Sequence, residues 1–298
     1  MPLVNVAVNL PRGDFMMRFD LDPDRPTEGV ILSYLKQGAL YEPEVATLFT
    51  RAIQAGDTVL DVGANIGIFS VLASRLVGPA GTVVAFEPGP DNLERLAVNV
   101  ALNDAANVTV VDHPASNAIE SVTFHLNSDN EGGHSLWDPG EHPHHHKSRE
   151  NARSIVTTTT TIDAEVARLG LAPPRLIKID TEGAEHRVLQ GAADLLREFE
   201  IPYIIAELHN FGLERLGSSQ DVLRGCMADF GYDTFLLYTD GSLPKLVPRR
   251  TRIESPYFLN VLFSTPDDVA ALWAVETHDP RARAPDEPTA RSNTDQSS

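Results

Sequence analysis

The chain has 298 residues, of which 42% are hydrophobic, so it is long and apolar enough to bury the core of one large domain. Disorder of the whole chain is thereby excluded, and the single cysteine, Cys226, excludes an internal disulfide. Its 24 Lys and Arg against 42 Asp and Glu give a net charge of −18, which repels phosphate backbones and argues against nucleic acid as a partner.

The first 40 residues are interpreted as an N-terminal extension, in which two short apolar runs, Val4–Val8 and Phe15–Phe19, predict strands. These strands would add an edge to a sheet, cover an acceptor site, or form a contact between the subunits of a homo-oligomer. No basic start and no long apolar stretch marks a signal peptide or a membrane span, so we expect a cytoplasmic protein.

The alternation of apolar runs that follows predicts one large domain over residues 41–275. A helix over 43–53 leads into strand, helix, strand, helix and strand, which is the βαβαβ order of a doubly wound parallel sheet with helices on both faces. One helix follows the fourth strand, with its first turn at Glu182 and Glu185 and its core positions between 188 and 199, and another over 218–230 continues the pattern. The predicted strands are Thr58–Val62, Thr82–Phe86, Val108–Val111, Leu176–Ile179, Tyr203–Glu207, Asp233–Tyr238 and Tyr257–Phe263. The last two suit an antiparallel end, so we expect a mostly parallel, seven-stranded α/β sheet.

An insertion over about residues 117–175 interrupts this order. Within it, residues 121–126 and 155–162 are expected to pair as strands around a polar, histidine-rich loop, and a short helix over 163–169 is expected to end at a glycine. From residue 276 to 298 the chain is rich in Pro, Asp, Arg, Ser and Thr with almost nothing to bury, and we interpret this segment as a disordered tail.

The most informative motif is the turn after the first strand of the sheet, Val59-Leu-Asp-Val-Gly-Ala-Asn-Ile-Gly67. Gly63 and Gly67 leave room for a ligand close to the backbone before a helix begins. A dinucleotide fingerprint would need its glycines closer together, and here Asn65 stands where the second would be. Asp61 would repel a pyrophosphate, but it favours the cationic ammonium and sulfonium groups of S-adenosylmethionine.

Polar residues also follow the next two strands. Glu87 comes 20 positions after Gly67, which is the spacing of an acid that accepts hydrogen bonds from both hydroxyls of a ribose. Asp112, Ala115 and Ser116 follow the third strand, where we expect the adenine. Asp112 or Ser116 could bond its exocyclic amine, and an ordinary polar loop is the alternative for all three.

Acidic residues gather after the fourth and fifth strands of the sheet. Asp180 ends the fourth strand, and Glu207 and His209 end the fifth. Because neighbouring parallel strands end at the same edge of a sheet, these side chains and Glu182 are expected to converge on one acceptor. Glu182 and Glu185 also lie in the first turn of a predicted helix, where favourable electrostatics with the helix dipole is the alternative role.

From about Tyr41 to Phe263 the sequence resembles the FkbM-type family of S-adenosylmethionine-dependent class I methyltransferases. The resemblance is carried by Tyr41-Glu-Pro43, Val59–Gly67, Phe86-Glu-Pro88 with Asn92, Leu93, Leu96 and Asn99, Gly132-Gly-His-Ser-Leu136, Ile177–Glu185 with Leu189 and Gly191, and Glu207-Leu-His209. It implies a Rossmann-like methyltransferase sheet. It also implies an O-methyltransferase that acts on a hydroxyl of a small molecule, a sugar or glycan, or a polyketide-type natural product.

The resemblance also extends the candidate site. Counting the residues already named, the cofactor site would comprise Glu42, Asp61, Gly63, Ala64, Asn65, Gly67, Glu87, Pro88, Asn92, Asp112, Ala115, Ser116 and Asp180. The acceptor site would comprise His134, Ser135, Glu207 and His209. An ordinary polar loop is the alternative for His134.

Methyl transfer from a sulfonium requires mainly that an acceptor oxygen is aligned with the methyl group and loses its proton. Asp180 or His209 is the expected base, since a neutral histidine accepts a proton well near pH 7 whereas a carboxylate needs a raised pKa. Glu182 is a further catalytic candidate. Alternatively, Asp180, Glu182 and Glu207 hold a divalent cation such as magnesium, which lowers the pKa of the acceptor hydroxyl.

A second candidate for metal binding is the histidine run His142, His144, His145 and His146. We interpret it as a loop, because it lacks regular ligand spacing and a cysteine or carboxylate framework. Two other functions remain as alternatives for the chain. A nicotinamide-dependent oxidoreductase is disfavoured by Asn65 and Asp61, and a non-catalytic binding protein with a degenerate methyltransferase fold is disfavoured by the presence of Glu87 and Asp180.

Overall fold

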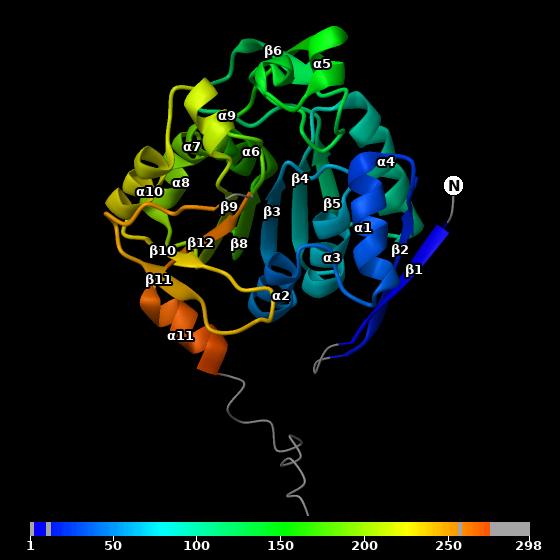
Figure 1. The fold of residues 1–298 in the computed structure, drawn as a ribbon. Helices are drawn as coiled ribbons and strands as arrows, with labels where there is room; N and C mark the ends of the chain where they lie inside the picture. Colours follow the sequence, from blue (N-terminus) through cyan, green and yellow to red (C-terminus); the bar gives the residue numbers. More distant parts are fainter. Residues whose placement is uncertain (1–2, 10–12, 256–257, 275–298) are drawn as a thin grey trace, which may run out of the picture.

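The computed structural model describes residues 3–9, 13–255 and 258–274 and is built around one eight-stranded sheet (Figure 1). The strand order is β11-β10-β12-β9-β8-β3-β4-β5. These strands are β3 (Thr58–Val62), β4 (Thr82–Phe86), β5 (Val108–Val111), β8 (Leu176–Ile179), β9 (Tyr203–Glu207), β10 (Asp233–Leu236), β11 (Lys245–Val247) and β12 (Asn260–Ser264). Neighbouring strands pair in parallel along β5, β4, β3, β8 and β9. The sheet then continues with β12, β10 and β11 in antiparallel pairing. The predicted mostly parallel α/β architecture is confirmed.

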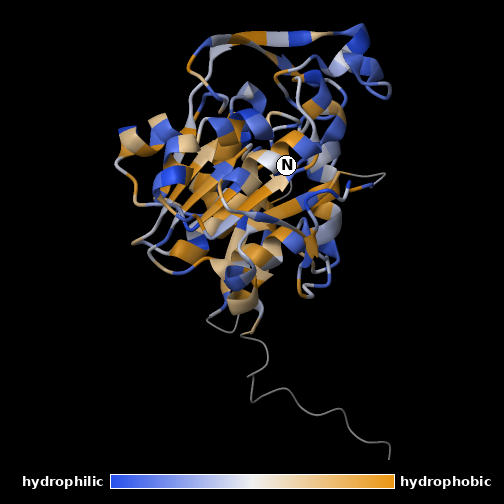
Figure 2. Ribbon diagram, turned by 90° about the vertical axis from the view of Figure 1, so that its left-hand side faces the viewer, coloured by the Kyte–Doolittle hydropathy of each residue, from blue (hydrophilic) through white to orange (hydrophobic). Residues whose placement is uncertain are grey.

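Helices cover both faces of this sheet. They are α1 (Pro26–Lys36), α2 (Pro43–Ala52), α3 (Ile68–Val77), α4 (Pro90–Leu102), α5 (His146–Glu150), α6 (Ile162–Leu169), α7 (Glu185–Gln190), α8 (Ala193–Glu198), α9 (Asn210–Arg215), α10 (Gln220–Asp229) and α11 (Pro266–Ala274), with a 3-10 turn η1 (Pro139–Glu141). Successive strand residues bury on opposite faces, because side chains alternate along a strand. Val59 packs with α2 and α3, whereas Leu60 packs with α7 and α8. Figure 2 shows hydrophobic residues concentrated in the central strands.

The sheet has one strand more than the seven expected. β11 lies in the polar segment between the last two predicted strands and pairs with β10, with Phe235 opposite Leu246. Backbone pairing with an open strand edge needs no apolar pattern, so the sequence carries little signal for it. β12 begins at Asn260, and residue 257, where this strand was expected to start, lies outside the described residues.

The single helix expected over 188–199 is two helices, α7 and α8, that are separated at Gly191. The Asp163 carboxylate accepts hydrogen bonds from Asp194 N–H at 3.0 Å and Leu195 N–H at 2.9 Å, so it caps a new helix start. Gly191 also approaches another segment closely, since a Cβ there would lie 2.0 Å from the carbonyl oxygen of Ser116. Apolar spacing continues across the break, which explains why periodicity alone predicts one helix.

Two small antiparallel units flank the main sheet. In the N-terminal extension, the two expected strands, β1 (Leu3–Val8) and β2 (Phe15–Asp20), pair with each other in a separate sheet, and Asp20 N–H of β2 donates to Asn99 Oδ1 of α4 at 2.9 Å. In the insertion, β6 (Ser121–Leu126) pairs with β7 (Arg153–Thr158). β7 ends before its expected limit because the Thr161 hydroxyl accepts from Ala164 N–H at 3.1 Å and starts α6 there.

No helix in the described ranges is both long and apolar enough to cross a bilayer. The expected tail over 276–298 lies outside the described residues.

Candidate functional site

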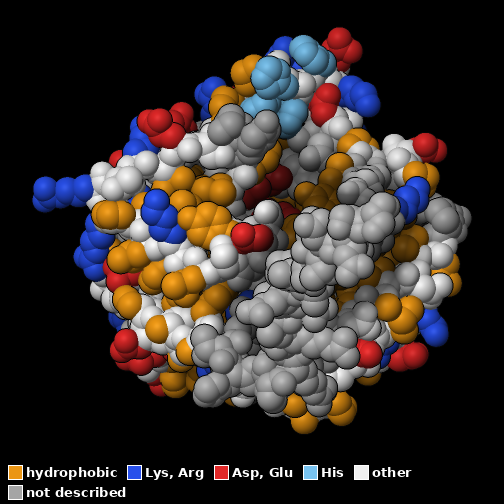
Figure 3. Space-filling model, turned by 60° about the horizontal axis from the view of Figure 1, so that its bottom comes forward, with side chains coloured by type: hydrophobic (Ala, Val, Ile, Leu, Met, Phe, Trp, Pro, Cys, Tyr) orange, Lys and Arg blue, Asp and Glu red, His pale blue; other side chains and the backbone are white. Residues whose placement is uncertain are grey.

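A cavity lies at the carboxyl ends of β3, β4, β8 and β9, at the edge where parallel strands of one sheet end together. Its walls also come from α1, the segment before α2, the insertion and residue 258. Figure 3 shows Asp and Glu side chains deep in a hollow of this face, with a histidine patch beside it.

The turn after β3 forms the floor of this cavity. Gly63 has a φ of 83°, and a Cβ there would lie 1.8 Å from the carbonyl oxygen of Asp180, so only glycine fits between the ends of β3 and β8. Asn65 has a φ of 51° and donates its backbone N–H to Glu87 Oε2 at 2.8 Å. The predicted turn and the predicted ribose-binding acid are therefore joined directly.

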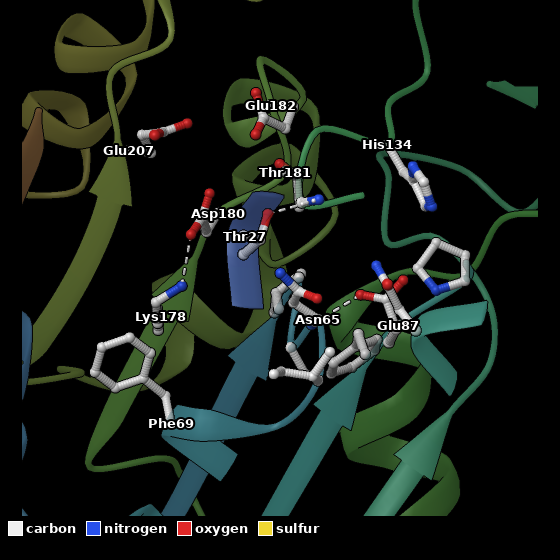
Figure 4. Close-up of a pocket in the computed structure, with 18 of the residues that line it drawn as sticks. Thr27, Asn65, Phe69, Glu87, His134, Lys178, Asp180, Thr181, Glu182 and Glu207 are labelled. Atoms are coloured by element: carbon white, nitrogen blue, oxygen red, sulfur yellow. Dashed lines mark hydrogen bonds and ion pairs between the residues drawn. The ribbon is translucent and has the colours of Figure 1, made fainter. Parts of the chain in front are cut away.

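Glu87 is held by two backbone donors at one end of the cavity (Figure 4). Besides Asn65 N–H, Gly89 N–H donates to its Oε1 at 2.7 Å, and the residue is 4% exposed. Burial raises the pKa of the Glu87 carboxyl to about 7, against the opposing effect of these hydrogen bonds. Nearby, Asn92 donates its Nδ2 to the carbonyl of Glu131 at 2.9 Å, while its buried Oδ1 has no protein partner.

Carboxylates dominate the other end of the cavity. We call Asp180, Glu182 and Glu207 together the acidic cluster. One oxygen from each lies within 4.8 Å of the others. Burial, followed by repulsion from neighbouring carboxylates, raises the pKa of Glu182 and of Glu207 well above the usual value. The buried Oε2 of Glu207 has no hydrogen-bond partner. Such a group is costly to ionise unless a cation or a donor reaches it.

Lys178 is the cation that faces this cluster. Its side chain is 3% exposed, and its Nζ donates to Asp180 Oδ2 at 2.8 Å. Burial lowers the pKa of Lys178, but Asp180, Glu42 and Asp61 reverse the effect and raise it above the usual value. Lys178 lies within the motif Ile177–Glu185, but the sequence alone does not show that its side chain faces a cavity.

His209 supports the acidic cluster from behind. Its Nδ1 accepts from Gly212 N–H at 2.8 Å, so the neutral ring carries its proton on Nε2, which lies 3.2 Å from Glu182 Oε2. Burial lowers the pKa of His209 to about 4. The ring is stacked on Phe258, with 4.5 Å between centroids, and is not among the residues that line the cavity. In this geometry His209 is a donor to Glu182 and not a free base.

Trp137 of the insertion holds the backbone of Glu182. Glu182 has a φ of 56°, and its carbonyl accepts from Trp137 Nε1 at 2.6 Å. Gly183 and Gly212 cross beside it, since a Cβ on Gly183 would lie 2.3 Å from the carbonyl carbon of Gly212. The only sequence signal for this contact is the tryptophan itself, which directly follows Leu136 in the insertion.

The structure places most of the predicted site residues on the cavity wall. Those that line it are Glu42, Gly63, Ala64, Asn65, Glu87, Pro88, Asn92, Ala115, His134, Asp180, Glu182 and Glu207. Those that do not line it are Asp61, Gly67, Asp112, Ser116, Ser135 and His209. Lining residues that sequence reasoning did not assign include Thr27, Tyr41, Asn130, Lys178 and Phe258.

The residues off the wall have other contacts. Asp61 is buried behind the cavity and accepts from the Ser70 hydroxyl of α3 at 2.6 Å. The Asp112 side chain is 72% exposed and lies 3.7 Å from His113. Ser135 donates its hydroxyl to the carbonyl of Trp137 at 2.8 Å, so it serves the fold of the insertion.

The histidine run packs on aromatic rings outside the cavity. The His142 ring centroid lies 4.4 Å from that of His145 and 4.8 Å from that of Phe211. This arrangement agrees with the interpretation of the run as a loop.

Comparison with known proteins finds methyltransferases. A sequence profile of the family described as "Methyltransferase FkbM domain" matches residues 61–234. The chain is 28% identical over 169 residues to the hexuronic acid methyltransferase AglP of Haloferax volcanii, covering 56% of this chain and 62% of that protein. It is 31% identical over 202 residues to the 31-O-demethyl-FK506 methyltransferase FkbM of Streptomyces tacrolimicus, covering 58% and 73%. The match to AglP thus spans less than two thirds of that protein.

A likeness to solved structures is also found. A putative methyltransferase from Streptococcus mutans in complex with SAH has a TM-score of 0.41 and 13% identity, covering 76% of this chain and 98% of that one.

Proposed function

The chain belongs to the FkbM methyltransferase family, and from this premise we propose that it transfers the methyl group of S-adenosylmethionine to a hydroxyl of a small molecule or glycan. One observation carries the proposal: a cavity at the strand ends whose buried, unpartnered polar atoms are all hydrogen-bond acceptors. These atoms are Glu42 Oε2, Asn65 Oδ1, Asn92 Oδ1 and Glu207 Oε2. S-adenosylmethionine fits such a wall, because its ammonium and ribose hydroxyls are donors and it carries positive charge.

We assign the two ends of the cavity to different parts of the reaction. Glu87 accepts from the ribose hydroxyls, because each of its oxygens keeps a lone pair beyond the one used by a backbone N–H. Glu42, together with Asp180 of the acidic cluster, attracts the cationic groups of the cofactor. Asp61 acts from behind the wall, through its charge and through the turn that it supports.

The acceptor hydroxyl is assigned to the acidic cluster. Asp180 is the proposed proton acceptor, since one of its oxygens is paired with Lys178 and the other is left for the substrate. Glu182 and Glu207 position the acceptor by accepting its hydroxyl groups. His209 was the other base considered, and its Nδ1 is already engaged by Gly212 N–H, so we assign it to holding Glu182.

The relatives indicate the kind of acceptor to try first. One is named for a hexuronic acid and another for 31-O-demethyl-FK506. We propose a hydroxyl of a sugar or of an oxygenated natural product, and an acceptor other than nucleic acid because the chain carries a charge of −18.

We further propose that the acidic cluster binds a divalent cation. Three carboxylates within 4.8 Å match the oxygen ligands that Mg²⁺ and Mn²⁺ prefer, and the unpartnered buried Oε2 of Glu207 gives independent support. When bound, such a cation would supply Lewis acidity to an acceptor hydroxyl.

The test of methyl transfer uses S-adenosylmethionine labelled in its methyl group. Wild type is incubated with glucuronic acid, with simple glycosides and with hydroxylated macrolides, and product is compared with that of Asp180→Asn. We expect wild type to form a labelled methyl ether of the acceptor, and we expect Asp180→Asn to form none. Calorimetry that finds no binding of S-adenosylhomocysteine to the wild type would refute the proposed function.

The cation has a separate test that needs no acceptor. Mn²⁺ binding is followed by electron paramagnetic resonance for wild type and for Glu207→Gln, with Glu141→Gln, an exposed carboxylate outside the cavity, as the matched control. We expect binding by wild type and the control and a loss of at least tenfold in Glu207→Gln. Equal binding by all three proteins would show that the acidic cluster is not the site.

A further inference from the structure

His134 lines the cavity near Glu87, on the opposite side of the close-up from Asp180 and Glu207 (Figure 4). The glycine at position 89 shows how close the two residues come. A Cβ there would lie 2.8 Å from Glu87 Oε1, 2.6 Å from His134 Cδ2 and 3.4 Å from His134 Nε2. The edge of the imidazole and the proposed ribose-binding carboxylate therefore approach the same point.

The tautomer of His134 is determined by a backbone contact. Its Nδ1 accepts from Asn127 N–H at 3.0 Å, so the neutral ring carries its proton on Nε2. Burial lowers the pKa of His134 to about 4, which keeps the ring neutral near pH 7. Among the described residues no group accepts from Nε2. The Nε2–H donor of a ring that lines the cavity is thus left for a ligand.

Hydrogen bonds to α1 hold the loop that carries His134 over the turn after β3. Thr27 of α1 donates its N–H to Glu131 Oε1 at 3.0 Å and accepts at its hydroxyl from Gly132 N–H at 3.1 Å. Gly132 lies so close to the turn that a Cβ there would be 3.4 Å from Asn65 Nδ2. The N-terminal extension and the insertion therefore meet above the part of the cavity assigned to the cofactor.

The same end of the cavity has an apolar wall. Pro88 and Ala115 contribute to it from the segments after β4 and β5, and Phe124 and Leu136 contribute from the insertion. The Phe124 and His134 rings meet edge to face with centroids 6.2 Å apart. A flat, weakly polar group such as a purine suits this surface.

We propose that the insertion binds the adenosine half of the cofactor, with His134 Nε2–H as a specific donor to it. This inference rests on the proposed function and deepens it. It also reverses the expectation that His134 lines the acceptor site: the acceptor is assigned to the acidic cluster at the other end, and His134 stands beside the ribose-binding Glu87.

The experiment compares two ligands and complementary substitutions. S-adenosylhomocysteine contains the whole product cofactor, whereas 5′-methylthioadenosine contains only its adenosine half. His134→Asn keeps an oxygen near the position of Nδ1 for Asn127 N–H but removes the Nε2 donor. His134→Gln places an amide near Nε2 and keeps a donor there. His142→Asn is the matched control, because His142 belongs to the same insertion and lies off the cavity.

Calorimetry at pH 7.5 then distinguishes the outcomes. We expect His134→Asn to weaken both ligands by a similar factor of about five or more, the effect of one lost hydrogen bond. His134→Gln should recover part of the affinity, and His142→Asn should stay within about twofold of wild type. Thermal unfolding of each variant checks that it is folded.

Three results would overturn the inference. One is wild-type affinity of His134→Asn for both ligands, and another is weakened binding of S-adenosylhomocysteine with unchanged binding of 5′-methylthioadenosine. The third is equal loss in His134→Asn and His134→Gln, which would assign the effect to loss of the imidazole ring and not to its Nε2 donor. Failure of the wild type to bind S-adenosylhomocysteine would instead refute the proposed function itself, and this inference with it.

Discussion

Replacement of Glu87 by glutamine tests the cofactor end of the cavity most directly. In wild type, Oε1 and Oε2 each accept one backbone N–H, at 2.7 and 2.8 Å, and each keeps a lone pair for a ribose hydroxyl. In Glu87→Gln one of these oxygens becomes an NH₂ group that accepts nothing. A hydrogen bond to a charged acceptor contributes about 1.5–3 kcal/mol, so affinity for S-adenosylhomocysteine should fall roughly 10- to 150-fold.

The fold should lose part of its stability, because the new NH₂ group cannot accept the backbone N–H that this oxygen of Glu87 accepts in wild type. A loss of about 1–3 kcal/mol is expected, and a thermal scan checks that the variant is folded. Burial raises the pKa of Glu87 to about 7. The same pKa predicts a pH effect. Between pH 6 and pH 8 wild type loses the Glu87 proton and regains an acceptor, so its affinity should rise, whereas that of Glu87→Gln should not gain from this group.

Calorimetry over this pH range measures both effects. Asp112→Asn is the control, since it makes the same acid-to-amide change at an exposed residue near the cavity that does not line it, and its affinity should stay within about twofold of wild type. A loss of less than threefold in Glu87→Gln, or an equal loss in Asp112→Asn, would refute the assignment of Glu87 to the ribose.

Three further predictions concern stability. Gly63→Ala should destabilise the protein by more than about 3 kcal/mol, or prevent folding, because its Cβ would lie 1.8 Å from the Asp180 carbonyl oxygen at a positive φ. A free energy of unfolding near that of wild type, measured with denaturant, would contradict this prediction. Glu207→Gln should not lower the melting temperature of the ligand-free protein, since burial already raises the pKa of Glu207 far above its usual value, and a drop of several degrees in a thermal scan would argue against that. The pKa values of Glu87 and Glu185 are both raised to about 7, so the folded state binds their protons more tightly than the unfolded state. The free energy of unfolding of the ligand-free protein should therefore fall between pH 5 and pH 8, by on the order of 3 kcal/mol per group, and a rise in urea denaturation over this range would refute the expectation.

Local sequence determined the central strands and the turns between them. The apolar runs of β3, β4, β8 and β9 end where a polar or glycine residue follows, and their bounds agree with the predicted ones. Because parallel neighbours end at one edge, the convergence of Asp180, Glu182 and Glu207 follows from strand order alone, and the structure confirms that they lie together. These features depend on residues that are near in sequence or on a general rule of sheet topology.

Only the tertiary structure decided which polar groups face the cavity. Asp61 shares the strand face of Val59, so it meets Ser70 of α3 and not the ligand side. His209 became a donor to Glu182 because Gly212 N–H occupies its Nδ1. Such outcomes depend on hydrogen bonds between segments whose meeting is set by packing, which periodicity and spacing do not encode.

The insertion shows most clearly which contacts local sequence does not encode. Its strands could be predicted from β-branched runs, but the contacts of Trp137 with Glu182 and of Gly132 with Thr27 join residues 45 and 105 positions apart. The sequence by itself thus determined a parallel sheet with acids at its carboxyl edge. The three-dimensional packing of the N-terminal extension and the insertion decided how that edge is covered, because these distant segments come together only when the hydrophobic core on both faces of the sheet is formed.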